Sequence, residues 1–197
     1  MKDILILYYS SNGATEALAR EVCRGVDSVK NMSARLRTVP SVSPDNKITK
    51  EEIPASGPTY VNIKDLVECS GLILGSPTRF GNMSASLKYF IDSTSTDWVK
   101  GTLSGKPAGV FTSTSSLHGG SESTLLTMAL PLLHHGMFYV GVPYSEKALS
   151  STKTGGSPYG ASHVTWNKNP DSLSNDEKSI AFALGKRVSE VASKLET

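Results

Sequence analysis

The chain alternates short apolar runs with segments of helical spacing along most of its 197 residues. Apolar runs of strand length lie at residues 3–9, 34–39, 71–75, 108–112 and 137–142. Helical spacing marks residues 14–26, 63–69, 84–91, 121–135 and 174–195. Parallel strands need a crossover connection, so this alternation predicts a parallel sheet with helices on both faces. We therefore predict a doubly wound α/β fold with five strands.

The length suits one domain, which we take as residues 1–197. Two stretches fit no regular element, and we interpret both as excursions from the core. Residues 40–60 contain four prolines, and residues 143–170 are rich in Ser, Thr, Gly and Tyr. Long loops in a compact domain usually serve binding or assembly.

Charge and composition exclude several classes of function. The formal net charge is +2, with the basic residues scattered, so we expect no nucleic-acid partner. Cys23 and Cys69 form no C-x-x-C pair and are interpreted as reduced core residues. Strand residues begin within three positions of Met1 and no apolar run approaches the ~20 residues of a membrane span, so we expect a cytoplasmic protein without a leader or span.

The turn at residues 10–15 carries the clearest chemical signal. It lies directly between the first predicted strand and the first predicted helix, where unpaired backbone N–H groups and the helix dipole favour an anion. Gly13 lets the chain approach that anion without a Cβ in the way. Neither G-x-G-x-x-G nor G-x-x-x-x-G-K-[ST] is present, which disfavours a dinucleotide fingerprint or a Walker loop. We predict a monophosphate cradle made of Ser10, Ser11, Asn12, Gly13, Ala14 and Thr15.

Two further polar loops follow the third and fourth predicted strands. Each alone is equally typical of a plain βα turn, because Gly, Pro, Ser and Thr dominate such turns. In a doubly wound sheet, however, the carboxyl ends of these strands meet at one crevice, where ligands bind. The three loops together suit a flat ring system that carries a phosphate. The second loop supplies Pro77, Thr78, Arg79, Phe80 and Gly81, and the third supplies Ser113, Thr114, Ser115, Ser116, Leu117 and His118.

Several runs resemble one known family over nearly the whole chain. The runs are PTRFGNMS at 77–84, FID at 90–92, KPA at 106–108 with FTST at 111–114, HHGM at 134–137 and GGSPYGA at 155–161. They are similar to the WrbA family of flavodoxin-like NAD(P)H:quinone oxidoreductases. The resemblance implies a three-layer sandwich with strand order 2-1-3-4-5, bound FMN, NADH or NADPH as co-substrate, a quinone acceptor and a homotetramer.

The resemblance also implies roles for individual residues. The turn at 10–15 would hold the FMN phosphate, the loop at 77–81 would border the isoalloxazine, and residues 113–118 would line its pyrimidine and ribityl side. His134 matches a histidine beside the flavin, although without the resemblance helix C-terminal electrostatics or core packing explains it better. Trp98 matches a substrate-site tryptophan given by a neighbouring subunit, with a core or assembly role as the alternative. Asn12 stands where some members carry an aromatic associated with nicotinamide binding.

The predicted reaction is hydride transfer from NAD(P)H to FMN, then two-electron reduction of a quinone to a hydroquinone in the same pocket, a ping-pong scheme. We assign no catalytic acid or base, because the cofactor carries the difficult chemistry, and His118 is either polar lining or a proton donor. One alternative is a flavodoxin-type electron carrier, although such carriers are usually strongly acidic. A non-catalytic FMN-binding scaffold also stays open, because binding a cofactor does not prove turnover.

Overall fold

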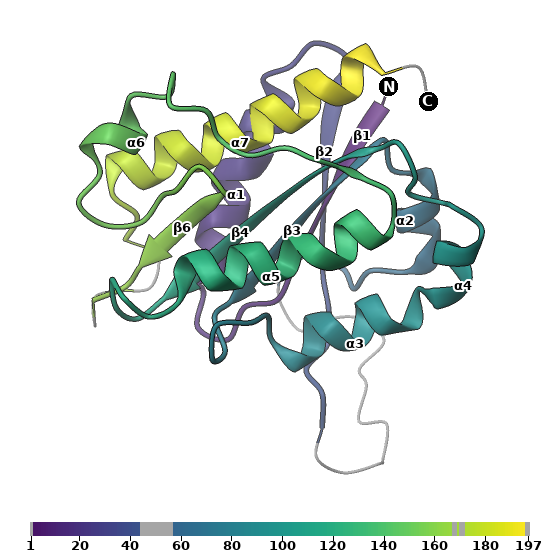
Figure 1. Ribbon diagram of the computed structural model, residues 1–197, viewed down its shortest axis with the longest axis horizontal. Helices are drawn as coiled ribbons and strands as arrows, with labels where there is room; N and C mark the ends of the chain where they lie inside the picture. Colours follow the sequence, from purple (N-terminus) through teal and green to yellow (C-terminus); the bar gives the residue numbers. More distant parts are fainter. Residues whose placement is uncertain (1, 44–56, 167–168, 170–171, 196–197) are drawn as a thin grey trace.

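The computed structural model describes residues 2–43, 57–166, 169 and 172–195, and its strands form one parallel sheet (Figure 1). The order β2-β1-β3-β4-β5 confirms the expected flavodoxin-like arrangement, and a sixth strand, β6, also pairs with β4. The strands are β1 (Lys2–Tyr8), β2 (Met32–Thr38), β3 (Gly71–Pro77), β4 (Pro107–Thr114), β5 (Phe138–Tyr139) and β6 (Ala161–Val164).

Helices cover both faces of the sheet, which confirms the three layers (Figure 1). Alternate residues of β1 show the division: Ile4 and Ile6 pack in the core under α1 and α7, whereas Leu5 and Leu7 pack in the core under α2, α3 and α5. The helices are α1 (Ala14–Asp27), α2 (Ile63–Glu68), α3 (Ala85–Ser93), α4 (Ser95–Val99), α5 (Ser121–His134), α6 (Ala148–Ser151) and α7 (Asn175–Lys194).

The outer position beside β4 is filled by two short strands rather than by one. β5 pairs with the start of β4, and β6 pairs with its end, from Phe111↔Ala161 to Thr114↔Val164. The expectation that residues 143–170 hold no regular element is therefore wrong, since α6 and β6 lie there. The four residues of β6, Ala-Ser-His-Val, are all buried, but two are polar, so they do not form an apolar run.

Local signals explain the other elements well. The α7 helix begins with a capping box in which Ser174 and Glu177 exchange hydrogen bonds with each other's backbone N–H.

Both cysteines are free thiols, and burial raises the pKa of Cys69 to about 11 and that of Cys23 to about 12. Of the predicted excursion at 40–60, residues 44–56 lie outside the described residues.

Candidate functional site

A crevice of about 460 Å³ lies at the carboxyl ends of β1, β3 and β4, within the range of small-molecule sites. Hydroxyl groups dominate its lining. The lining residues are Ser10, Ser11, Asn12, Ala14, Thr15, Pro77, Thr78, Arg79, Ser113, Thr114, Ser115 and Thr165. The structure therefore brings members of all three predicted loops together.

The turn after β1 has the geometry of an anion cradle. Gly13 is the N-cap residue of α1 with φ 87°, a left-handed conformation that favours glycine, and no side chain caps the helix there. The Gly13 N–H donates to Ser10 Oγ at 3.1 Å. Thr15, which is buried, is fixed by a 2.8 Å hydrogen bond between its Oγ1 and Ser113 Oγ. The first N–H groups of α1 are thus available to an anion in the crevice.

The loop after β3 is a tight turn that presents an aromatic ring. Arg79 and Asn82 exchange backbone hydrogen bonds of 2.8 and 3.1 Å, and the two residues between them have positive φ, 53° for Phe80 and 74° for Gly81. A bulky residue in the left-handed region is strained. Phe80 adopts this strained conformation although its side chain is fully exposed. Strain of this kind clusters at functional sites, where surrounding contacts maintain it.

Contacts with α5 hold this turn in place. Thr78 Oγ1 lies 2.6 Å from Thr124 Oγ1, and Thr127 Oγ1 donates to the Gly81 carbonyl at 3.2 Å. Arg79 reaches across to the first loop, where its Nη2 donates to Ser11 Oγ at 3.1 Å. The turn therefore brings a cation beside the anion cradle.

The loop after β4 is only partly in the crevice. Ser113, Thr114 and Ser115 line it, whereas Ser116, Leu117 and His118 are exposed and are not among the lining residues. The Thr114 hydroxyl donates to the Ser116 carbonyl at 2.8 Å, which fixes the start of the loop.

His134 and Trp98 lie away from this crevice and next to each other. His134 ends α5, roughly 20 Å along the helix from Ser121 at 1.5 Å per residue, and Ser121 is the end near the crevice. The indole N–H of Trp98 donates to the His134 carbonyl at 2.7 Å. His134 therefore does not line this crevice.

One lining residue, Thr165, lies outside all three predicted loops. It directly follows β6, and its N–H donates to the Thr114 carbonyl at 3.0 Å. Sequence reasoning missed it because β6 was not predicted. The one feature of the sequence that could have indicated β6 was the cap-rich start of α7, whose Glu177 holds β6.

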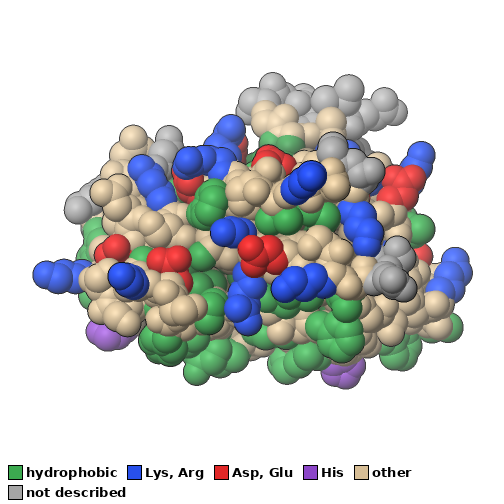
Figure 2. Space-filling model, turned by 90° about the horizontal axis from the view of Figure 1, so that it is seen from above, with side chains coloured by type: hydrophobic (Ala, Val, Ile, Leu, Met, Phe, Trp, Pro, Cys, Tyr) green, Lys and Arg blue, Asp and Glu red, His purple; other side chains and the backbone are tan. Residues whose placement is uncertain are grey.

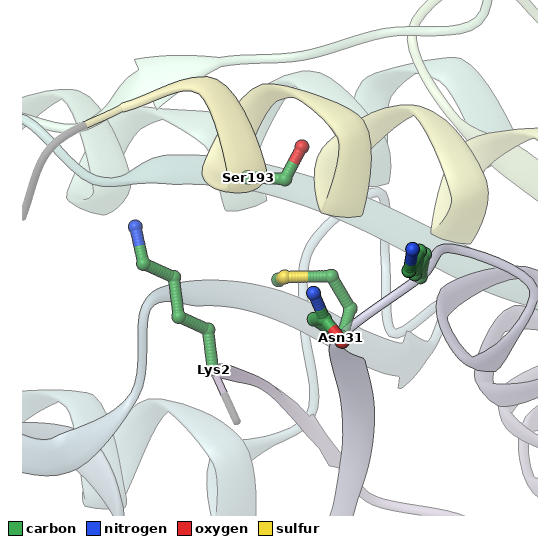
Figure 3. Close-up of a pocket in the computed structure, with 5 residues that line it drawn as sticks. Lys2, Asn31 and Ser193 are labelled. Atoms are coloured by element: carbon green, nitrogen blue, oxygen red, sulfur yellow. The ribbon is translucent and has the colours of Figure 1, made fainter.

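A second cavity of about 470 Å³ lies at the opposite end of the sheet (Figure 3). Figure 3 shows Lys2 and Asn31 beneath Ser193 of α7. Lys2 Nζ already donates to the Leu195 carbonyl at 2.8 Å. None of the three polar loops reaches this cavity, so the chemistry favours the hydroxyl-lined crevice as the functional site.

The crevice residues fit FMN. An uncapped helix start and Arg79 suit its phosphate, and the hydroxyls of Ser113 and Thr114 suit a polyhydroxyl chain. Phe80 and Gly81 are not among the lining residues, although Phe80 presents an exposed ring on the loop that supplies Thr78 and Arg79. A parallel sheet in this order with such a crevice at its carboxyl edge defines a protein of the flavodoxin-like class.

The family model for "NADPH-dependent FMN reductase" matches residues 3–148. A "NAD(P)H dehydrogenase (quinone)" of Solidesulfovibrio magneticus is 38% identical, with 98% of each chain covered. One of the same name from Chromohalobacter salexigens is 40% identical, with 99% of each covered. The chain belongs to this FMN reductase family, which confirms the resemblance found in the sequence.

Solved structures share the fold. A flavodoxin, WrbA-like protein from Agrobacterium tumefaciens has a TM-score of 0.68 at 23% identity, with all of both chains covered. An archaeal flavodoxin has a TM-score of 0.64 at 17% identity, with 97% of this chain and 99% of the other covered. Among the described residues, no helix is both long and apolar enough to cross a membrane.

Proposed function

We propose that this protein is an FMN-dependent NAD(P)H:quinone oxidoreductase. The observation that carries the proposal is the crevice, in which an uncapped helix start, the Arg79 cation and a row of hydroxyl groups converge. The names of the two full-length relatives support the same activity. Bound FMN supplies the redox chemistry, in which NAD(P)H gives up a hydride and a quinone then gains two electrons and two protons.

The chain's own residues bind and orient in this scheme. The start of α1 and Arg79 hold the phosphate, while Thr78 and Phe80 lie along the ring. Ser113 to Ser115 hold the hydroxyl chain. Asn12 lines the crevice beside the cradle, where it is placed to contact the second substrate.

Self-association completes the proposed site, because His134 and Trp98 lie far from their own crevice. Leu126, Leu130 and Leu133 form an exposed stripe at i, i+4 and i+7 of α5, on the face away from the core. Figure 2 shows hydrophobic side chains gathered along the lower edge of that view. Exposed apolar patches of this kind mark protein interfaces. We therefore propose self-association in which neighbouring subunits bring Trp98 and His134 to the flavin. The family resemblance makes this assembly a homotetramer, and the cytoplasm stays its expected compartment.

The test is one anaerobic cuvette in which the purified protein receives FMN, then NADH or NADPH, then benzoquinone. The oxidoreductase predicts that the bound flavin bleaches with the nicotinamide and recovers with the quinone. Bound flavin that neither nicotinamide reduces would support the carrier or scaffold alternative. Failure to bind FMN would contradict the proposal altogether.

A further inference from the structure

The end of β6 forms a side of the crevice to which no role has been assigned. We propose that Thr165 binds the ribityl phosphate portion of FMN and that the buried His163–Glu177 pair positions it there. This inference rests on the proposed function, because it assumes that the crevice holds FMN. It adds a binding residue and a positioning pair from a segment that follows the crevice loops in the chain.

A row of buried polar side chains connects the pair to the crevice. Ser113 of β4 lies directly opposite His163 of β6 in the parallel register. Ser113 in turn contacts Thr15 of the anion cradle at 2.8 Å, and His163 Nδ1 lies 3.0 Å from Glu177 Oε2. Register partners point to the same face of a sheet, about 4.8 Å apart. A shift of β6 therefore also displaces Ser113, which lines the crevice.

The Glu177 carboxylate joins three parts of the chain. Its Oε1 accepts from the N–H of Gly155 and of Val164, each at 3.0 Å. Its Oε2 accepts from the Ser174 N–H at 2.8 Å as well as from His163. Burial alone raises the pKa of Glu177, but the hydrogen bonds from His163, Ser174 and Val164 outweigh it and lower the pKa to about 2. The carboxylate is therefore ionised at neutral pH and holds β6 against α7.

The segment is tightly packed up to the crevice. A Cβ on Gly155 would lie 2.0 Å from the Ser162 carbonyl oxygen, so this connection fits β6 only with glycine there. Directly after Thr165, Trp166 adopts φ 48° although it is bulky and partly exposed. This strain at the crevice edge is a second indication that the end of β6 serves binding and not only folding.

The first test removes the Thr165 hydroxyl with T165V and measures the FMN dissociation constant by flavin fluorescence. Loss of one hydrogen bond weakens FMN binding by about fivefold. The matched control is T38V, which removes a hydroxyl that donates to the Tyr8 carbonyl at 3.0 Å from β2 and does not line the crevice. We expect its dissociation constant to stay within about twofold of the unaltered protein. Equal affinity in T165V and the unaltered protein would overturn the binding role.

The second test separates positioning from stability. We expect H163L to weaken FMN binding by about tenfold, and H163N, which keeps a donor near Nδ1, to recover most of that loss. The control V188A truncates a buried side chain of α7 elsewhere in the core and loses stability without loss of affinity. If V188A lost as much FMN affinity as H163L, or if H163N did not recover affinity, the role of His163 would be structural alone.

Tryptophan fluorescence gives a readout that does not depend on activity. The chain has two tryptophans, so W98F leaves Trp166 as the single reporter beside Thr165. We expect FMN to quench Trp166 in W98F, and quenching at saturating FMN to fall by about half when H163L is added, because the end of β6 moves away. Unchanged quenching would overturn the positioning role. If the unaltered protein binds no FMN, the proposed function fails, whereas equal binding by all the variants contradicts this inference alone.

Discussion

The two sides of the crevice are built in different ways. The side from β1 and β3 consists of short turns whose shapes come from local backbone features, such as the left-handed Gly13 and the paired turn at Phe80 and Gly81. The side from β6 is held by a buried charge on α7, so its position depends on contacts between segments far apart in the chain. The first side should therefore tolerate loss of a polar group with little loss of stability, whereas the second should not.

The largest expected effect is the loss of the carboxylate from the β6 side. E177L leaves His163 and the N–H groups of Gly155, Val164 and Ser174 without their acceptor, so we expect the free energy of unfolding to fall by about 3–5 kcal/mol. The comparison is S10A on the other side, which removes a single acceptor and costs about 1 kcal/mol. Urea unfolding without FMN measures both, and similar losses would erase the distinction between the sides.

Acid should weaken the β6 side selectively. The pKa of Glu177 is about 2 in the folded protein and about 4.3 in an unfolded chain, so the folded state binds fewer protons between these values. Its stabilisation is complete above about pH 4.5 and is lost as the pH falls towards 2, by on the order of 3 kcal/mol. Urea unfolding at successive pH values should therefore show a shallower acid slope for E177Q. Parallel slopes would mean that Glu177 is not the titrating group.

A smaller effect is expected at the anion cradle. G13A adds a Cβ where a phosphate would approach, so we expect the FMN dissociation constant to rise by at least about tenfold. The matched control is G105A, since Gly105 has a similar φ of 78° but open space around its Cβ position. Both variants carry the same left-handed strain, so both lose about 1–2 kcal/mol of stability. Fluorescence titration with FMN separates them, and equal affinities would remove the cradle from the site.

The same contrast explains how much could be predicted from sequence. The strand order, the layers and the loops after β1, β3 and β4 follow apolar periodicity and turn residues, which are local signals. The end of β6 was missed because His163 and Ser162 are polar in sequence, and their burial depends on distant partners such as Glu177 and the Gly156 N–H. The place of His134 away from the crevice follows from the same topology, because α5 begins at the carboxyl end of β4 and His134 is its last residue.

The smallest expected effect tests whether the first side stores strain for function. Asn tolerates the left-handed region better than Phe, so F80N should raise the free energy of unfolding by about 0.5–1 kcal/mol. The lost ring should raise the KM for benzoquinone several-fold, because the exposed Phe80 ring, proposed to lie along the flavin, then no longer helps to enclose a quinone beside it. F80Y keeps both strain and ring and should match the unaltered protein in both measurements. If F80N instead lowers the free energy of unfolding, the Phe80 ring contributes to packing. The two sides of the crevice would then differ only in how they are held.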